Sequence, residues 1–326
     1  MKLSIITINY NNAEGLRKTL ASVASQTYAD IEHVIVDGGS TDESVEIIRE
    51  YADNEAIRLE GYKAIRQESS EDNDTVPNRP IAQSPDCHEI HWISEPDKGI
   101  YNAMNKGIRM ATGEYIQILN SGDILAADDV TERMMAALAS YSEQCERSTG
   151  EAELQQSDLP TILYGNMIKE YPDGKRVVDR CQAKDYTPES FYYFYRGTLN
   201  HDCAYIRRDL FEKYGLYNEE MKICSDWEWY VRAIVLGGER TVYTNIDVTV
   251  FDMTGISESN GKNKDIILKE RREYLESILP VAVLRDYDMF SLPIEQYRRL
   301  KKYHLWGIVY FVERVLFKFE KWFRKR

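Results

Sequence analysis

Acidic and amide side chains recur directly after four apolar segments of this 326-residue chain. The four clusters read TINYNN at 7–12, DGGSTD at 37–42, SEPDKG at 94–99 and NSGD at 120–123. Each one by itself is typical of a turn followed by a helix cap. In open α/β sheets, however, ligands bind at the carboxyl ends of the parallel strands. Recurrence after all four segments therefore favours one polar binding site over four unrelated turns.

Asp37 is suited to recognising a nucleotide. Its carboxylate can accept a hydrogen bond from the N3–H of uracil or from a ribose hydroxyl. Gly38 and Gly39 would let a ligand approach the backbone closely. These glycines match neither the G-x-G-x-x-G pattern nor the P-loop, which disfavours dinucleotide and P-loop chemistry. The turn is therefore interpreted as a site for a pyrimidine nucleotide.

Asp123 is suited to holding Mg²⁺ or Mn²⁺ against a diphosphate. Because the NSGD motif contains a single acid, phosphate oxygens and water would have to complete the coordination, as is usual for Mg²⁺. A cation at this position would neutralise the diphosphate as it leaves.

Asp226 begins a predicted helix in CSDWEWYVRA and is the candidate general base. That role needs an ionised carboxylate within hydrogen-bond reach of the attacking hydroxyl, whereas the alternative is a cap that complements the helix dipole. Glu228 points about 200° away on the helix and is the weaker candidate. His201, in LNHDCAYIRR, is either structural or in contact with the diphosphate or the acceptor.

The elements that must position these residues follow an alternating pattern. Apolar segments rich in β-branched residues predict strands at 3–8, 33–37, 90–94 and 115–119, with helical periodicity between them. This alternation predicts an α/β fold with a mostly parallel sheet flanked by helices. Ser40 and, three residues later, Glu43 match a capping box that predicts the start of the second helix.

The chain is divided by two polar segments, at about 61–89 and 142–158, which lack periodicity and are interpreted as surface insertions. We predict a catalytic domain over 1–255 and a helical C-terminal extension over 256–326.

A basic amphipathic helix is predicted at about 303–325 in this extension. Residues 298–326 contain ten Lys and Arg against two Glu. Eight apolar side chains fall within about 120° on a helical wheel: Leu305, Ile308, Val309, Val312, Val315, Leu316, Phe319 and Phe323. The pattern favours a helix that lies on an anionic membrane surface. Docking on the protein's own core or on the partner in a homodimer is the alternative.

Composition excludes several classes of protein. Hydrophobic residues make up 43% and charged residues 29%, a globular balance. The net charge of -13 argues against nucleic acid as a partner. Five cysteines with no C-x-x-C pair fit a reducing compartment. Because neither a secretory signal nor a span of about 18 apolar residues is recognisable, we expect a cytoplasmic protein, peripheral on the inner face of the plasma membrane if the tail binds lipid.

The order of these motifs resembles the family 2 inverting glycosyltransferases of the GT-A fold, and most closely their bacterial O-antigen, capsule and exopolysaccharide branch. The resemblance covers about residues 1–250. It is carried by IITINYN at the start, VIVDGGSTD at 34–42, SEPDKGIYNAMNKGIRMATGEYIQILNSGD at 94–123 and SDWEWYVRA at 225–233.

The resemblance implies a nucleotide-sugar donor, a divalent cation and transfer with inversion at the anomeric carbon. By position it implies that the catalytic base is Asp226 and the metal ligand is Asp123. The nucleotide-binding residues that it implies are Thr7, Asn9, Tyr10, Asp37, Asp97 and Lys98. The residues near the donor and acceptor sugars would be Asn120, Ser121, Gly122, His201 and Trp227.

Three positions depart from the family's motifs. Gly38 stands where a second acid often follows the first, Asn120 and Gly122 precede Asp123 where the metal motif often reads Asp-x-Asp, and Ser225 stands where Glu commonly precedes the base. Recognition of the nucleobase would then rest on Asp37, and the affinity for the metal would depend on the bound substrate.

We therefore predict an inverting glycosyltransferase that moves a sugar from a nucleotide donor, with UDP favoured, to a hydroxyl of a growing, lipid-linked surface glycan. The alternative is a non-catalytic nucleotide-sugar-binding subunit of a glycan assembly complex. A nucleotidyltransferase is disfavoured because the chain lacks basic, glycine-rich phosphate loops.

Overall fold

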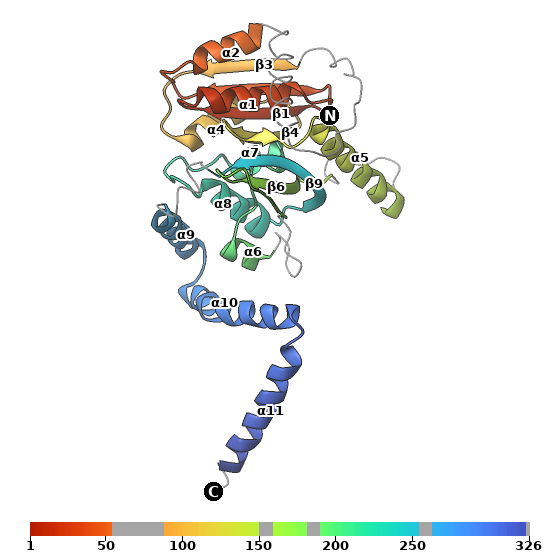
Figure 1. Ribbon diagram of the computed structural model, residues 1–326, viewed down its shortest axis with the longest axis vertical. Helices are drawn as coiled ribbons and strands as arrows, with labels where there is room; N and C mark the ends of the chain where they lie inside the picture. The colour runs from red at the N-terminus through yellow and green to blue at the C-terminus, as the bar shows by residue number, and fades with distance from the viewer. Residues whose placement is uncertain (54–87, 150–158, 181–189, 254–262, 324–326) are drawn as a thin grey trace. The chain divides into compact units, whose positions relative to one another are not determined.

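The computed structural model describes residues 1–53, 88–149, 159–180, 190–253 and 263–323. The chain forms two compact units, Met1–Arg271 and Arg272–Arg326. The first contains the whole sheet, shown in Figure 1. The functional division predicted near residue 255 stays a prediction.

One sheet forms the centre of the first unit, with the strand order β3-β2-β1-β4-β8-β6-β9-β5, and with β7 paired to β6. The strands are β1 Leu3–Asn9, β2 Ile31–Asp37, β3 Glu89–Ser94, β4 Tyr115–Asn120, β5 Ile124–Leu125, β6 Ile162–Glu170, β7 Arg176–Asp179, β8 Ala204–Arg207 and β9 Thr241–Asp252.

The first half of the sheet is parallel, as predicted. Strands β3, β2, β1 and β4 run in the same direction, and their register pairs Asn9 with Asp37, Asp37 with Ser94, and Ile8 with Asn120. All four strands therefore end at the same edge. The second half is mixed, because β8 is antiparallel to both β4 and β6, whereas β6 and β9 are parallel. The predicted α/β fold with flanking helices is confirmed.

Helices flank the sheet on both sides and continue into the second unit. They are α1 Ala13–Ala24, α2 Ser44–Asp53, α4 Ile100–Met110, α5 Val130–Thr149, α6 Phe191–Arg196, α7 Asp209–Tyr214, α8 Ser225–Tyr230, α9 Lys264–Ile278, α10 Val281–Lys302 and α11 Trp306–Phe323. A π-helix, Val231–Leu236, directly follows α8.

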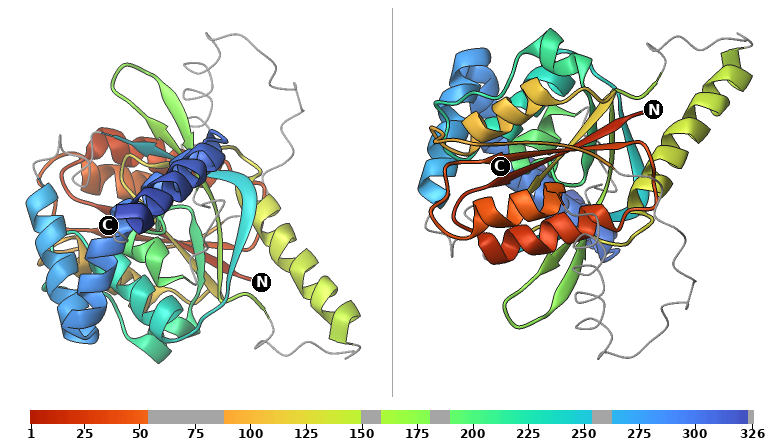
Figure 2. Two further views of the ribbon diagram at one scale, coloured as in Figure 1. Left: turned by 90° about the horizontal axis from the view of Figure 1, so that it is seen from below. Right: turned by 90° about the horizontal axis from the view of Figure 1, so that it is seen from above.

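The two faces of the parallel strands pack against different helices (Figure 2). Leu16 and Leu20 of α1 form a buried cluster with Ile35 of β2 and with α2. On the other face α4 lies so close that a Cβ at Gly107 would be 2.3 Å from a methyl carbon of Ile6. Apolar residues that alternate between the faces of β1 and β2 therefore hold the strand-end loops in place from both sides.

Two local predictions were wrong or incomplete. Helix α2 begins at Ser44 rather than after Ser40, because the Ser40 hydroxyl donates instead to Asp37, at 2.5 Å. A carboxylate oxygen of Asp42 accepts from the N–H of Ser44 at 3.0 Å. Helix α5 continues to Thr149, into the segment interpreted as an insertion at 142–158. Of the other predicted insertion, 61–89, residues 61–87 lie outside the described residues.

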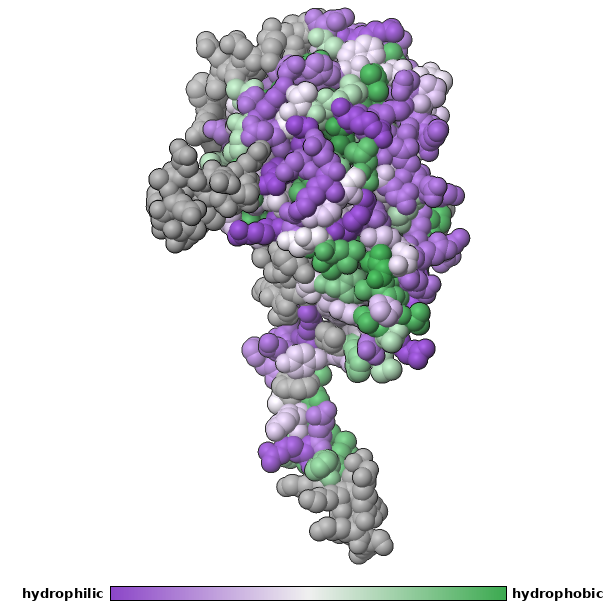
Figure 3. Space-filling model, turned by 180° about the vertical axis from the view of Figure 1, so that it is seen from behind, coloured by the Kyte–Doolittle hydropathy of each residue, from purple (hydrophilic) through white to green (hydrophobic). Residues whose placement is uncertain are grey.

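The second unit contains the end of α9 with α10 and α11. Helix α11 covers most of the predicted amphipathic helix, and it exposes large apolar side chains, among them Ile308 and Leu316. Figure 3 shows apolar and hydrophilic residues together on the visible face of this part of the chain. None of the described helices combines the length and the apolar character needed to cross a bilayer.

Candidate active site at the strand ends

The carboxylate of Asp37 organises the turn after β2. It accepts hydrogen bonds from Asn9 Nδ2 at 2.8 Å, from the N–H groups of Gly39 and Ser40 at 3.1 and 2.9 Å, and from the hydroxyls of Ser40 and Ser94 at 2.5 and 2.7 Å. Burial disfavours the charged form, but these hydrogen bonds outweigh it and hold the pKa of Asp37 below its usual value. A nucleotide would therefore have to displace one of these donors to contact this carboxylate.

Gly38 leaves room for Asp97 beside this turn. A Cβ at Gly38 would be 2.3 Å from a carboxylate oxygen of Asp97 and 3.2 Å from the ring of Tyr10. Tyr10 is 63% exposed, and the Lys98 side chain is exposed next to Asp97. Three of the predicted nucleotide-binding residues thus lie together at the end of β1 and after β3. The glycine where the family often has a second acid gives Asp97 this space.

The turn after β4 carries the predicted metal ligand. Gly122 has a φ of +112°, which an L side chain rarely adopts. Thr19 of α1 accepts from the Gly122 N–H at 2.9 Å and donates to the Asp123 carbonyl at 2.7 Å. Asn12 donates to the Ser121 carbonyl at 2.8 Å. Helix α1 and the loop before it therefore hold the NSGD turn in place.

A continuous chain of side chains joins the predicted metal ligand to the predicted base. Asn120 Nδ2 lies 3.2 Å from Asp123 Oδ2 and 3.4 Å from His201 Nε2. His201 Nδ1 lies in turn 3.3 Å from Asp226 Oδ2. These residues come from the end of β4 and the turn after it, from the loop before β8 and from the first turn of α8. They are distant in sequence and meet in one place. The two acids belong to one site rather than to different surfaces.

His201 and Asp226 form a mostly buried ion pair. Burial disfavours both charged forms, but the contact between the two groups outweighs it, so the pKa of Asp226 is lowered and the pKa of His201 is raised. The charges of Asp202 and Asp123 raise the pKa of His201 further. Asp226 is therefore ionised at neutral pH, as a general base must be.

Asp123 has the opposite perturbation. Burial, followed by the charge of nearby Asp202, raises the pKa of Asp123 to about 7. Burial also raises the pKa of Asp202, whose carboxylate accepts from Thr249 at 2.5 Å. Two buried carboxyl groups in one place favour binding of a cation, because a cation stabilises their ionised forms. This local charge balance fits a divalent ion at Asp123.

Asn120 supplies a second observation for a cation at this position. Its Oδ1 atom is buried and has no hydrogen-bond partner among the described residues. A buried amide oxygen without a partner is costly unless an unseen water or ion satisfies it, and amide oxygens are ligands that hard cations accept. Asp123 and Asn120 would therefore hold the ion, with phosphate oxygens and water as the other ligands.

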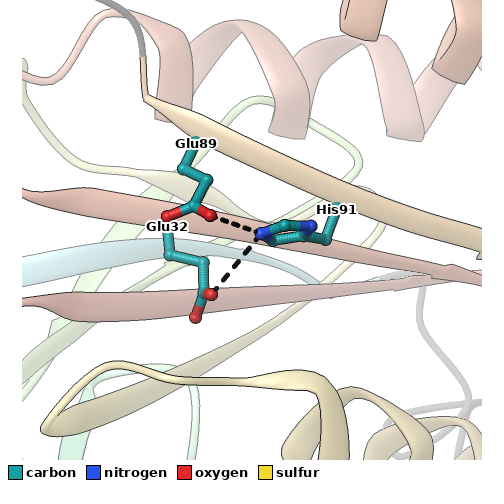
Figure 4. Close-up of side chains that lie close together, drawn as sticks. All are labelled: Glu32, Glu89 and His91. Atoms are coloured by element: carbon teal, nitrogen blue, oxygen red, sulfur yellow. Dashed lines mark hydrogen bonds and ion pairs between the residues drawn. The ribbon is translucent and has the colours of Figure 1, made fainter.

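Three other side chains, two glutamates and a histidine, lie close enough together to hold a metal ion. Among the described residues, Glu32, Glu89 and His91 place one potential ligand atom each within 4.8 Å (Figure 4). They lie at the starts of β2 and β3, at the sheet edge opposite Asp37. Lys2 already pairs with Glu89 and Glu32, at 2.5 and 3.6 Å. We therefore interpret this group as an ion-pair network that joins neighbouring strands.

A cavity of about 380 Å³ lies beside Asp226. Its wall comes from the start of α4, from Asn120 and His201, and from the segment 219–226. Lys98 and Lys222 are among the lining residues, and Ile100, Met104, Met221 and Ile223 contribute apolar surface. Glu219 and Glu220 also line the wall and balance the two lysines. The cavity thus brings the candidate base together with apolar surface suited to a sugar face.

Thr7 and Trp227 are predicted site residues whose side chains are buried and make contacts inside the protein. Thr7 is fully buried, and its hydroxyl lies 2.9 Å from His33 Nε2. Trp227 is 1% exposed, and its indole N–H donates to the Phe194 carbonyl at 2.8 Å. Direct contact of these two side chains with a substrate stays a prediction that the described conformation does not favour.

Sequence reasoning missed several residues of the site. Asp202 directly follows His201 in LNHDCAYIRR, but nothing in the sequence signals that an acid between strands is buried. Tyr101, whose hydroxyl lies 3.2 Å from Asp226 Oδ1, reads in sequence as an apolar position of a helix. Asp252 ends β9, and its N–H donates to Asp123 at 3.2 Å. Strand-end position was the one signal that could have identified Asp252.

Sequence comparisons find similarity to glycosyltransferases. Residues 4–71 match the sequence model of the family described as Glycosyl transferase family 2. A "PGL/p-HBAD biosynthesis glycosyltransferase" of Mycobacterium tuberculosis is 27% identical over 271 residues, which are 82% of this chain and 81% of that protein. An "Uncharacterized glycosyltransferase" of the same species is 27% identical over 78% of this chain and 76% of its own length.

Solved structures share the fold. The chain is similar to S. aureus TarS 1-349 in complex with UDP-GlcNAc, with a TM-score of 0.56, 17% identity, and coverage of 86% of this chain and 69% of that one. It is also similar to TarS 1-349 in complex with UDP, with a TM-score of 0.51 and 18% identity. That match covers 77% of this chain and 60%, less than two thirds, of the TarS chain.

Proposed function

We propose that this chain is a metal-dependent, inverting family 2 glycosyltransferase that transfers a sugar from a nucleotide donor to a hydroxyl group. The observation that carries the proposal is the chain of contacts that runs from Asp226 through His201 and Asn120 to Asp123, beside a cavity of about 380 Å³. The match of residues 4–71 to the family and the relatives named glycosyltransferases support it. TarS, which shares the fold, binds UDP and UDP-GlcNAc, so a UDP-linked donor is the one we propose.

In the proposed reaction the acceptor hydroxyl lies in the cavity within reach of Asp226. The acceptor oxygen attacks the anomeric carbon, its proton passes to the Asp226 carboxylate, and the electron pair of the breaking bond goes to the nucleotide diphosphate. Attack from the side opposite the leaving group inverts the anomeric centre. His201 keeps Asp226 ionised and oriented before transfer, and Lys98 of the cavity wall adds positive charge near the diphosphate.

A bound Mg²⁺ or Mn²⁺ would supply positive charge to the leaving diphosphate. Asp123 and the Oδ1 atom of Asn120 would hold it. Asp97, Tyr10 and Asn9 would contact the nucleoside, because they surround the turn that Asp37 organises.

For the acceptor we propose a lipid-linked glycan of the cell surface, reached at the cytoplasmic face of the membrane. The second unit supports this, because α11 exposes Ile308 and Leu316 to 61% and 58% and the segment 298–326 is strongly basic. Apolar side chains beside basic ones suit an anionic lipid surface. The alternative is a homodimer in which the partner chain covers this face of α11.

The experiment that tests the function begins with a thermal-shift screen of UDP-, GDP- and dTDP-sugars, with and without Mn²⁺. A ligand at 100 times its Kd should raise the melting temperature by about 5–10 °C. The selected donor is then incubated with a detergent extract of source-organism membranes, and released nucleotide is followed over several turnovers. No shift with any nucleotide-sugar would refute the proposal, and binding without turnover would favour the non-catalytic subunit.

A further inference from the structure

The segment 219–226 is the least regular part of the cavity wall, yet it leads directly into the candidate base. Its residues Glu219, Glu220, Met221, Lys222, Ile223 and Asp226 all line the cavity. No strand or helix covers residues 219–224, so their N–H groups need hydrogen-bond partners from elsewhere. The position of Asp226 depends on those partners.

Glu270 of α9 is the partner of three consecutive N–H groups in this segment. Its Oε1 accepts from Lys222 at 2.6 Å, and its Oε2 accepts from Ile223 at 3.1 Å and from Cys224 at 3.0 Å. Glu270 itself does not line the cavity. It therefore acts on the backbone that precedes Asp226 and not on a substrate.

Two further residues on the same face of α9 contact this region. The Cys224 thiol lies 3.8 Å from the carbonyl oxygen of Ile267, and the Arg271 guanidinium lies 5.0 Å from the ring centre of Trp227. Residues 267, 270 and 271 are spaced i, i+3 and i+4, so they share one side of the helix. This side of α9, which lies within the first compact unit, therefore contacts the start of α8 and the residues just before it.

From α4, the hydroxyl of Tyr101 contacts the same segment. It lies 2.5 Å from the Ile223 carbonyl oxygen and 3.2 Å from Asp226 Oδ1. Ile223 is thus held at its N–H by Glu270 and at its carbonyl by Tyr101. Both polar groups of this peptide position are fixed by helices that are distant in sequence.

We infer that Glu270 is a positioning residue for the transfer reaction: it fixes the backbone of 222–224 so that Asp226 and the cavity wall keep their productive geometry. This inference rests on the proposed function of Asp226. A displacement of about 1 Å in a reacting group can cost about 100-fold in rate. A carboxylate can accept all three N–H groups, whereas an amide places its own NH₂ against at least one of them.

The test compares Glu270→Gln with Glu273→Gln, which removes the same charge from an exposed position one turn further along α9. Amide hydrogen exchange at residues 222–224 should be about tenfold or more faster in E270Q than in the wild type or E273Q. We expect kcat to fall about 10- to 100-fold in E270Q, with the Kd for UDP within about threefold of wild type. The UDP contacts proposed here lie at other strand ends, which is why binding should persist.

Each outcome of this comparison is decisive. Unchanged exchange in E270Q, or faster exchange with unchanged kcat, would overturn the positioning role. A parallel loss of UDP affinity and activity would overturn it too, because it would indicate general destabilisation. A wild-type protein that binds no nucleotide-sugar would instead overturn the proposed function, which the exchange measurement does not depend on.

Discussion

Replacement of Asp226 by Asn tests the site most directly. The substitution keeps the size of the side chain but removes the charge that pairs with His201 at 3.3 Å and that lies 3.2 Å from the Tyr101 hydroxyl. An amide can still accept from Tyr101, so the main loss is one hydrogen bond between charged groups, worth about 2 kcal/mol. For a unit of this size the melting temperature should fall by about 4–8 °C.

Transfer should be affected far more than stability. Loss of a general base typically costs 100- to 10,000-fold, so we expect kcat of D226N to fall about 1,000-fold. The Kd for UDP should stay within about threefold, because the proposed nucleoside contacts come from other strands. Turnover is measured as nucleotide release with the donor selected by thermal shift, and UDP affinity is measured by calorimetry with Mn²⁺.

Glu228 provides a matched control on the same helix. It is 6% exposed and forms a comparable ion pair, with 2.9 Å between its Oε2 and Arg232 Nη2. Glu228→Gln should therefore lower the melting temperature similarly while leaving transfer within about threefold of wild type. Near-normal transfer by D226N would refute the assignment, and so would an equal loss of transfer in E228Q, because activity would then follow stability alone.

Three other predictions concern Asp123, Glu32 and helix α11. Asp123→Ala should abolish the increase in UDP affinity that Mn²⁺ produces, as measured by calorimetry, and an undiminished Mn²⁺ effect would contradict its role as metal ligand. Burial opposes ionisation of Glu32, but hydrogen bonds from Ser4 and Thr112 outweigh burial and hold the pKa of Glu32 below its usual 4.5. The ionised Glu32 therefore stabilises the fold above pH 4.5, and this contribution is lost as the pH falls through the lower pKa of the folded state. Glu32→Gln should therefore cost about 1–3 kcal/mol in urea unfolding at pH 7 and less near pH 3.5; an equal cost at both would be inconsistent with this account. Paired Ile308→Ser and Leu316→Ser substitutions should reduce sedimentation of the full chain with vesicles containing anionic lipid by about tenfold or more without changing UDP affinity, whereas unchanged sedimentation together with a loss of dimers would favour the homodimer.

The parallel half of the sheet could be predicted because each strand is an apolar run that ends at polar residues. Strands predicted at 3–8, 33–37, 90–94 and 115–119 lie within β1, β2, β3 and β4. The same rule placed Asp97 and Asp123 at one edge, since parallel strands end together. The start of α2 was predicted wrongly because the Ser40 hydroxyl has a stronger acceptor in Asp37 than in the helix that follows.

The contacts of Asp226 could not be predicted from the sequence pattern. The chain itself determined which residues could do chemistry, because a carboxylate after an apolar strand or in a first helical turn is recognisable locally. Only the tertiary structure decided that His201 links Asp226 to Asn120 and Asp123, and that Glu270, more than 40 positions later, holds the backbone before Asp226. Partners of this kind leave no periodic signal, because hydrogen bonds between distant segments depend on where the sheet and its helices bring them.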